Sequence, residues 1–208
     1  HIKVTPKGLY CPLGDFYIDP WQAVPNAVIT HAHADHARPG CGQYYAHPHT
    51  IAVLEKRWEA PFASTSFDYH HGPKLGEAQI SFHSAGHILG SAQVKITIGG
   101  QTTVVAGDYK RCLDPTCPPF EVVPCDTFVT EATFGLPVYH WPEPSQVAAT
   151  IVDWWQLNRA AGKPSLLFGY SLGKAQRLLL HLGEHELPGP LFLHPATARI
   201  CGVYTAHA

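Results

Sequence analysis

A short hydrophobic segment, NAVIT at residues 26–30, runs directly into a dense group of side chains that bind metals. Four candidate ligands follow it within six residues: His31, His33, Asp35 and His36. Imidazole and carboxylate groups at this density suit a borderline divalent ion such as zinc or manganese. The segment itself has the apolar character of a short buried strand that ends in a polar loop. The sequence therefore predicts a metal site at the end of a strand.

The spacing of these four residues favours two ions over one. His31 and His33 lie two positions apart, so on an extended segment their side chains point the same way. Asp35 and His36 are consecutive and follow a turn, so they can point at a second position. One tetrahedral ion cannot easily use all four, whereas two ions about 3.5–4 Å apart can, provided that further ligands come from elsewhere.

Two further candidates each follow a strand-like run and a glycine. His87 ends the segment SFHSAGH, and Asp108 follows TTVVAG. An aspartate in such a position can bridge two cations with its two carboxylate oxygens. A lone histidine is more often a core or surface residue than a ligand, but the combined pattern favours metal binding over that reading.

Composition limits the class of protein. The 208 residues are 45% hydrophobic and 14% charged, with a formal net charge of −2, which predicts one or two globular domains rather than a disordered chain. No apolar run approaches the ~18 residues of a membrane span, and the start does not resemble a signal peptide. The six cysteines form no CxxC pair, so we expect reduced thiols and a cytoplasmic protein without membrane contact.

The pattern of elements changes along the chain. The first ~135 residues indicate short strands and turns, with one helical segment at 49–60. Beyond them the pattern predicts a helix at 144–163, a strand at 165–170, a helix at 172–185 and a strand at 189–194. Because strands that alternate with helices indicate a parallel α/β unit, we expect two domains, at 1–138 and 139–208.

The metal motifs resemble those of the metallo-β-lactamase superfamily. Its HxHxDH motif matches residues 31–36 without a departure, and Asp19 in FYIDP matches an earlier aspartate of the family. The resemblance implies an α/β fold, the αββα sandwich, with two divalent ions, zinc or manganese. It also implies that Asp19 orients the metal loop from outside the ligand set. The implied ligands are His31, His33 and His87 for the first metal, Asp35 and His36 for the second, and Asp108 bridging both.

Further motifs resemble the β-CASP branch of this superfamily, which consists of nucleic-acid nucleases. They are SAGHILGSAQ at 84–93, GDYKR and TEATFG, and YSLGKAQRLL at 170–179 resembles part of the inserted parallel α/β cap of that branch. The resemblance is strongest to bacterial ligase-associated DNA exonucleases and more distant to the nuclease of the mRNA 3′-end processing complex. By resemblance, Glu131 would position a proton donor, and Glu131, Asp108 and Asp35 are the expected catalytic residues.

Two later histidine motifs of the branch have no match in this sequence. One supplies a proton donor and the other a ligand of the second metal. We therefore expect a chain that stops inside or soon after the cap and lacks the C-terminal return to the lactamase-type domain, with a cap at 139–208 that is partial.

The resemblance implies a two-metal nuclease that hydrolyses DNA phosphodiester bonds, with exonuclease action favoured, in DNA repair beside a DNA ligase and a helicase. Ser171, Gly173 and Lys174 precede a helix and are candidate phosphate contacts, although an ordinary helix start explains them equally well. The near-neutral charge balance argues weakly against nucleic acid, but bound cations add local positive charge. The alternatives are an RNA-processing endonuclease of the same branch, a small-molecule hydrolase of the lactamase or thioesterase type, and a non-catalytic scaffold.

Overall fold

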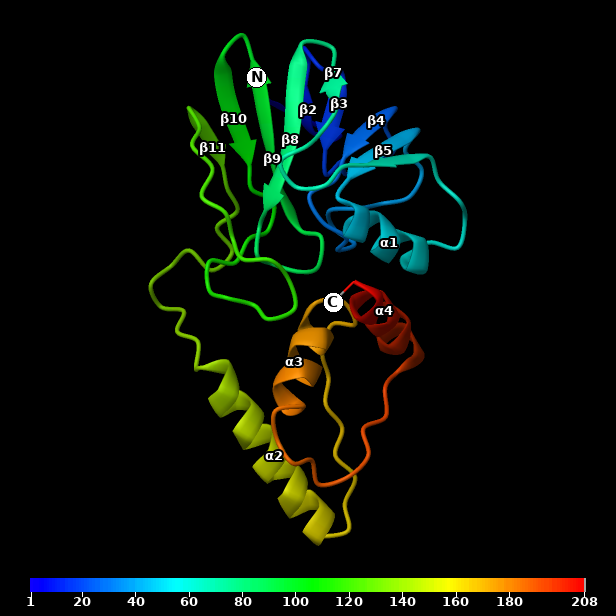
Figure 1. Ribbon diagram of the computed structural model, residues 1–208, viewed down its shortest axis with the longest axis vertical. Coiled ribbons are helices and arrows are strands. Elements are labelled where there is room, and N and C mark those ends of the chain that lie inside the picture. The colour runs from blue at the N-terminus through cyan, green and yellow to red at the C-terminus, as the bar shows by residue number, and fades with distance from the viewer. Residues whose placement is uncertain (208) are drawn as a thin grey trace. The chain divides into compact units, whose positions relative to one another are not determined.

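The computed structural model describes residues 1–207, which divide into two compact units (Figure 1). The first unit contains His1–Glu131 together with His207, and the second contains Ala132–Ala206. The division lies near the Pro-rich and aromatic-rich stretch where the sequence pattern changes. Among the residues described, no helix combines the length and the apolar character that a membrane span requires.

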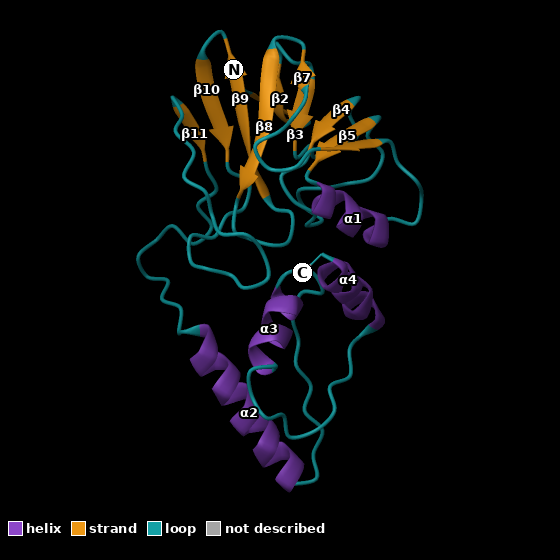
Figure 2. Ribbon diagram, in the orientation of Figure 1, coloured by secondary structure: helices purple, strands orange, loops and turns teal. Residues whose placement is uncertain are grey.

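The first unit contains two β-sheets, drawn in orange in Figure 2. The six-stranded sheet has the order β1 (Lys3–Thr5), β2 (Gly8–Cys11), β3 (Phe16–Ile18), β4 (Asn26–Val28), β5 (Gln43–Ala46) and β6 (Ser64–Ser66). The five-stranded sheet has the order β11 (Thr127–Val129), β10 (Gln101–Val105), β9 (Ala92–Ile98), β8 (Ala78–Ser84) and β7 (Lys74–Leu75). Strands β3 to β6 pair in parallel, as do β10 and β11, while the other pairs are antiparallel. Both sheets are therefore mixed.

The two sheets share one hydrophobic core. Strand β8 alternates along its length, and its buried Ile80 and Phe82 belong to the same cluster as Val94 on β9. The six-stranded sheet contributes Phe16 and Val28 to that cluster. Burying each of these large side chains stabilises the fold by about 1.5–3 kcal/mol. With the helices of the chain, these sheets confirm the predicted α/β class.

Local signals in this unit are also confirmed. Gly99 and Gly100 have φ values of +56° and +83° and form the turn between β9 and β10, which is the backbone conformation that a two-residue hairpin loop needs. The predicted helical segment at 49–60 forms helix α1 (Pro48–Arg57). Its N-terminus is capped by His47, whose Nδ1 accepts a hydrogen bond of 3.2 Å from the backbone N–H of His49.

The second unit consists of three helices joined by extended segments. The helices expected at 144–163 and 172–185 are confirmed as α2 (Pro144–Ala160) and α3 (Lys174–Leu182), and a third helix, α4, spans Pro195–Ala206. A small core of Ala148, Val152 and Leu182 joins α2 to α3. The sequence analysis did not predict α4, which has no strongly apolar face.

The two strands predicted in this unit are wrong. Residues 165–170 and 189–194 adopt no strand, and Phe168 and Phe192 are 85% and 87% exposed. Their apolar composition favours extended backbone, but a strand forms only when a neighbouring strand pairs with its N–H and C=O groups. Within the part of the chain that the structure describes, the parallel α/β arrangement expected for 139–208 is therefore not formed.

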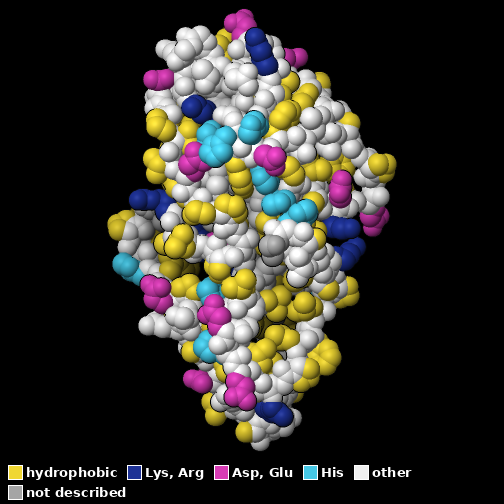
Figure 3. All heavy atoms as spheres, viewed as in Figure 1, with side chains coloured by type: hydrophobic (Ala, Val, Ile, Leu, Met, Phe, Trp, Pro, Cys, Tyr) yellow, Lys and Arg dark blue, Asp and Glu magenta, His cyan; other side chains and the backbone are white. Residues whose placement is uncertain are grey.

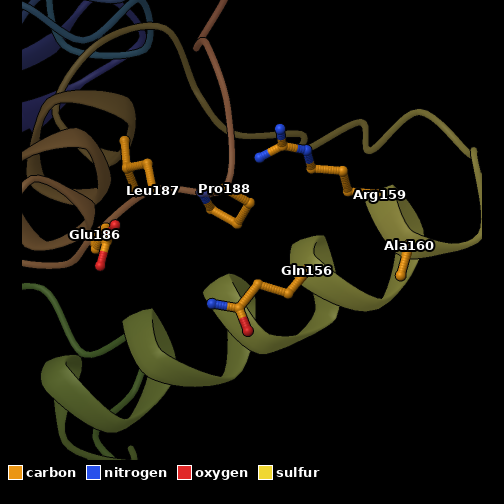
Figure 4. A pocket seen from close by; sticks show the side chains of 6 residues that line it. All are labelled: Gln156, Arg159, Ala160, Glu186, Leu187 and Pro188. Atoms are coloured by element: carbon orange, nitrogen blue, oxygen red, sulfur yellow. The ribbon is translucent and has the colours of Figure 1, made fainter.

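A cavity of about 550 Å³ lies in the second unit. Figure 4 shows Gln156 and Arg159 on α2 facing Glu186, Leu187 and Pro188 on the segment after α3. These side chains are mixed in character. The metal ligands predicted from the sequence lie in the first unit.

Candidate metal centre

The loop after β4 is folded so that its ligand candidates point to one side. The backbone N–H of Ile29 donates to the carbonyl of Tyr45 on β5, which holds the strand end in the sheet. The carbonyl of His33 then accepts from the N–H groups of His36 and Ala37, at 3.2 and 2.8 Å. After this turn the ring centroids of His31 and His36 lie 4.1 Å apart, against 4.8 Å for His31 and His33, so the two pairs of ligand candidates are close neighbours.

Four of the predicted ligands form a first group. The Nδ1 atom of His33 lies 3.0 Å from Nε2 of His31 and 3.3 Å from Nε2 of His87. Oδ2 of Asp108 lies 3.8 Å from the same atom of His31 and 3.7 Å from that of His87. Zinc bonds of about 2.0–2.1 Å in tetrahedral geometry place neighbouring donor atoms about 3.3–3.4 Å apart. The observed separations bracket that value, so the donor set fits a zinc ion.

A second group shares the same aspartate. Nε2 of His36 lies 3.2 Å from Oδ1 of Asp108 and 3.8 Å from Oδ2 of Asp35. The Asp108 carboxylate thus turns one oxygen toward each group, which is the arrangement a bridging ligand needs. The Asp35 side chain is 76% exposed and belongs to none of the close groups of metal-binding side chains found among residues 1–207, whereas the His36 side chain is only 21% exposed.

Asp19 holds the metal loop through three hydrogen bonds. Its Oδ1 accepts from the backbone N–H of Thr30 at 2.8 Å, and its Oδ2 accepts from the Thr30 hydroxyl at 2.6 Å. The same Oδ2 lies 2.7 Å from Nδ1 of His36. A proton on Nδ1 completes that hydrogen bond and leaves Nε2 of His36 facing Asp108. Asp19 therefore lies behind the group that contains His36 and orients the ring.

Sequence reasoning missed two residues that support this loop. The Thr30 hydroxyl, which donates to Asp19, lies 3.0 Å from Nδ1 of His31 and is able to accept the proton of that nitrogen. That contact fixes the ring with Nε2 toward the first group. The Arg57 guanidinium on α1 donates to the backbone carbonyl of Ala32. Thr30 was available in the motif as the hydroxyl residue directly before His31, whereas Arg57 is 25 residues away and carries no local signal.

Electrostatics in the centre follow from burial and from the two aspartates. Burial lowers the pKa of His31 well below its usual value, and the neighbouring imidazoles lower it further. Burial acts in the same direction on His36, but its hydrogen bonds to Asp108 and Asp19 outweigh this and raise its pKa to about 10. The hydrogen bond from His36 also lowers the pKa of Asp108. A cation bound beside Nε2 of His36 would therefore replace a proton.

Two glycines explain why the motifs read GH and GD. Gly107 has a φ of +58°, and a Cβ atom there would lie 2.6 Å from the Thr30 hydroxyl oxygen. Gly86 has a φ of +68°, and its Cβ would lie 2.5 Å from the carbonyl oxygen of Lys110. Both positions need a left-handed backbone and a close approach, which only glycine provides without strain. Each glycine thereby sets the direction of the ligand candidate that follows it.

Glu131 lies close to the same sheet edge as Asp108. Strands β10 and β11 are parallel, with Val105 opposite Val129, and the two acidic residues follow these strand ends by three and two positions. Glu131 is half-buried. It does not belong to the close groups of metal-binding side chains found among residues 1–207.

The predicted phosphate contacts lie at the start of α3 in the second unit. The N–H of Gly173 donates to Oε1 of Gln176 at 2.7 Å, and Nε2 of Gln176 donates to the carbonyl of Ser171 at 3.0 Å. The N–H of Lys174 donates to the carbonyl of Leu172. These groups already have partners within the chain, so the prediction now depends on the charge of Lys174, whose Nζ lies 5.4 Å from the centre of the Tyr170 ring.

Comparison with protein-family models finds no match to this chain. The chain is 31% identical over 199 residues to a protein named probable DNA ligase from Opitutus terrae. The aligned region covers 95% of the chain and 19% of that protein. It is 32% identical over 123 residues to the endoribonuclease YSH1 from Gibberella zeae, which covers 58% of the chain and 14% of that protein. The chain therefore spans less than a fifth of either relative.

One solved structure resembles the fold. A crystal structure of a protein of unknown function from Enterococcus faecalis matches 87% of this chain and 48% of its own, with a TM-score of 0.56 and 13% identity. The match shows a similar overall fold.

Proposed function

We propose that this chain carries the metal centre of a nuclease of the metallo-β-lactamase superfamily that hydrolyses phosphodiester bonds in DNA. Relatives named as a DNA ligase and as an endoribonuclease support that superfamily and a nuclease activity. The observation that carries the proposal is the position of Asp108, which turns one carboxylate oxygen toward each of two groups of imidazole side chains. Two sheets around one core fit the αββα sandwich of the superfamily.

The chemistry of the substrate explains why such a centre is needed. A phosphodiester is anionic and reacts slowly with water, so hydrolysis requires an activated nucleophile and neutralisation of charge on the phosphate oxygens. Two divalent cations, when bound, supply both. One would be held by His31, His33 and His87, and the other by Asp35 and His36. The nitrogen-rich first group suits zinc, whereas the two carboxylates of the second also suit manganese.

The residues of the chain then have distinct tasks. Asp108 fixes the spacing of the two groups and orients the nucleophile between them. Asp19 and Thr30 hold the rings of His36 and His31 so that Nε2 points inward. Glu131 would position a proton donor for the leaving oxygen, and that donor would come from outside the residues of this sequence.

The longer match favours DNA over RNA. The similarity to the ligase-named protein extends over 95% of the chain and supports a role in repair beside a DNA ligase. The helicase partner and the exonuclease action rest on the resemblance of the sequence motifs. Residues 139–208 would form part of a β-CASP cap, and Lys174 would contact a phosphate of the substrate. The second candidate is an RNA-processing endonuclease of the same branch, which the similarity to YSH1 favours.

The test is nuclease activity of the full-length protein on end-labelled single-stranded DNA and RNA, with manganese or zinc. We expect DNA to be shortened from one end, and Asp108→Ala to slow cleavage by at least about 100-fold. Asp153→Ala is the control, because that aspartate lies exposed on α2 in the other unit.

Each result has a defined meaning. Cleavage that persists unchanged in Asp108→Ala rejects the proposed two-metal centre. Internal cleavage of RNA alone selects the second candidate. Hydrolysis of a β-lactam or a thioester without nuclease activity selects a small-molecule hydrolase instead.

A further inference from the structure

A second cluster of metal-binding side chains lies in the first unit and shares no residue with the centre described above. It consists of His70, His83 and Glu121, whose ligand atoms all lie within 4.8 Å of one another. Oε1 of Glu121 lies 2.9 Å from Nδ1 of His83 and 3.8 Å from Nδ1 of His70. Figure 3 shows exposed histidine side chains beside acidic ones on the surface of this unit.

The backbone of β8 brings these three residues together. His83 lies on β8 between Phe82 and Ser84. The carbonyl of Phe82 accepts from the N–H of His70 at 2.7 Å, and the carbonyl of Ser84 accepts from the N–H of Glu121 at 3.0 Å. Both flanking segments are therefore tied to the strand next to His83, and the cluster is preorganised rather than formed by chance contact of mobile side chains.

Glu121 is held at its other end as well. Its backbone carbonyl accepts a hydrogen bond of 2.7 Å from Nε2 of Gln93, a fully buried residue on β9 that lies opposite His83 in the sheet. The carboxylate thus projects from a backbone that is fixed on both its N–H and its C=O side. Because the carboxylate is already held in place, binding an ion costs less conformational entropy.

His83 has the environment of a metal ligand. Its side chain is only 10% exposed, and its second ring nitrogen, Nε2, lies 3.0 Å from the hydroxyl of Ser81. Metal-ligating histidines usually donate their other ring N–H to such a partner, which fixes the tautomer. Nδ1 lies at hydrogen-bond distance, 2.9 Å, from Oε1 of Glu121; with the proton moved to Nε2 and donated to Ser81, the lone pair of Nδ1 is available to an ion that Glu121 also binds.

His70 approaches from a loop with an uncommon backbone conformation. Its φ is +69°, a left-handed conformation that residues other than glycine adopt uncommonly, histidine more often than most. The ring is 64% exposed. The open side of the cluster therefore leaves room for water as a further ligand.

We propose that His70, His83 and Glu121 bind a zinc ion that is separate from the nuclease centre. Two imidazoles and one carboxylate are a common zinc donor set with one position left for water. The donor separations of 2.9 and 3.8 Å lie on either side of the value of about 3.3 Å for tetrahedral zinc. The ion would join the loop at His70 and the segment at Glu121 to β8. Because the chain between Asp108 and β11 includes Glu121, the ion would also anchor the connection that leads to Glu131.

The test counts the zinc ions retained by the full chain after chelator treatment, addition of zinc and gel filtration. We expect His70→Asn and Glu121→Gln each to retain one zinc ion fewer than the unchanged chain. Asparagine tolerates the left-handed backbone at residue 70, and circular dichroism checks that each variant is folded. The matched control is His71→Asn, since His71 is the exposed neighbour and lies outside the cluster.

Asp108→Ala separates the two sites. We expect this variant to lose zinc from the nuclease centre while it keeps the ion at His70, and the double variant with His70→Asn to lose one ion more. Equal zinc retention by the unchanged chain, His70→Asn and Glu121→Gln overturns the proposal. An equal loss in His71→Asn also overturns it, because the loss would then not depend on the cluster.

Discussion

Asp19→Asn tests whether a residue behind the metal loop controls the second metal group. The carboxylate accepts three hydrogen bonds: one from the Thr30 N–H, one from the Thr30 hydroxyl and one from Nδ1 of His36. An asparagine amide keeps one acceptor oxygen and replaces the other with an NH₂ group. In either orientation of the amide, its NH₂ group faces at least one of the three groups that donate to Asp19. The ring of His36 also loses the negative charge that helps to fix its proton on Nδ1.

The size of the effect follows from these contacts. Removing the partner of a metal-ligating histidine lowers metal affinity by roughly 10–100-fold, or about 1.4–2.7 kcal/mol. We expect the larger loss at the group of Asp35 and His36, since Asp19 contacts the ring of His36 directly and that of His31 only through the Thr30 hydroxyl. Calorimetric titration with zinc or manganese resolves the two affinities.

The control is Asp15→Asn. Asp15 also has a left-handed backbone, with φ of +49° against +44° for Asp19, and it is exposed and accepts from the Tyr10 hydroxyl. Any effect of asparagine on that backbone conformation is therefore shared by both variants. Asp19→Asn that binds both ions as tightly as Asp15→Asn would refute the role assigned to Asp19.

Three further predictions concern pH and close packing. The hydrogen bonds of His36 to Asp108 and Asp19 raise its pKa to about 10, so an ion that binds at its Nε2 displaces a proton. The affinity of that group for the ion should therefore rise about tenfold per pH unit between pH 7 and 9. A flat pH profile would argue against His36 as a ligand. Burial lowers the pKa of His47 to about 4, below the ~6.5 of an unfolded chain, so the unfolded state takes up the proton first. The contribution of His47 to the free energy of unfolding should fall by about 3 kcal/mol as the pH drops from 6.5 to 4, and urea titrations of His47→Asn should lack this part of the pH dependence. Gly107→Ala should lower the free energy of unfolding by about 1–3 kcal/mol and weaken metal binding, because the new Cβ atom would meet Thr30. The control is Gly100→Ala, which is also at positive φ but has open space around it. It should leave metal binding unchanged in the calorimetric titration.

The sequence could predict that the ligand candidates lie close together, because the residues next to each candidate mark the end of a strand. His31, His87 and Asp108 each follow the end of a strand, and the residues just before them mark the turn. The alternating pattern of β8 and the glycine pair before β10 likewise depend on near neighbours in the sequence. Such signals fix which side chains point into the centre without knowledge of the whole chain.

The supporting contacts and the second unit could not be predicted in the same way. Arg57 reaches the carbonyl of Ala32 across 25 positions, and no motif marks that pairing. The segments at 165–170 and 189–194 have strand-like composition, but strand formation depends on a partner that composition does not specify. The cluster of His70, His83 and Glu121 likewise forms through backbone hydrogen bonds to β8, which connect residues far apart in the sequence.

The most direct test of the central claim is anomalous X-ray scattering from crystals of the chain grown with zinc or manganese. The account predicts two peaks that share Asp108, one among the rings of His31, His33 and His87 and the other beside Asp35 and His36. A single peak, or peaks that leave Asp108 without a bound metal, would contradict it.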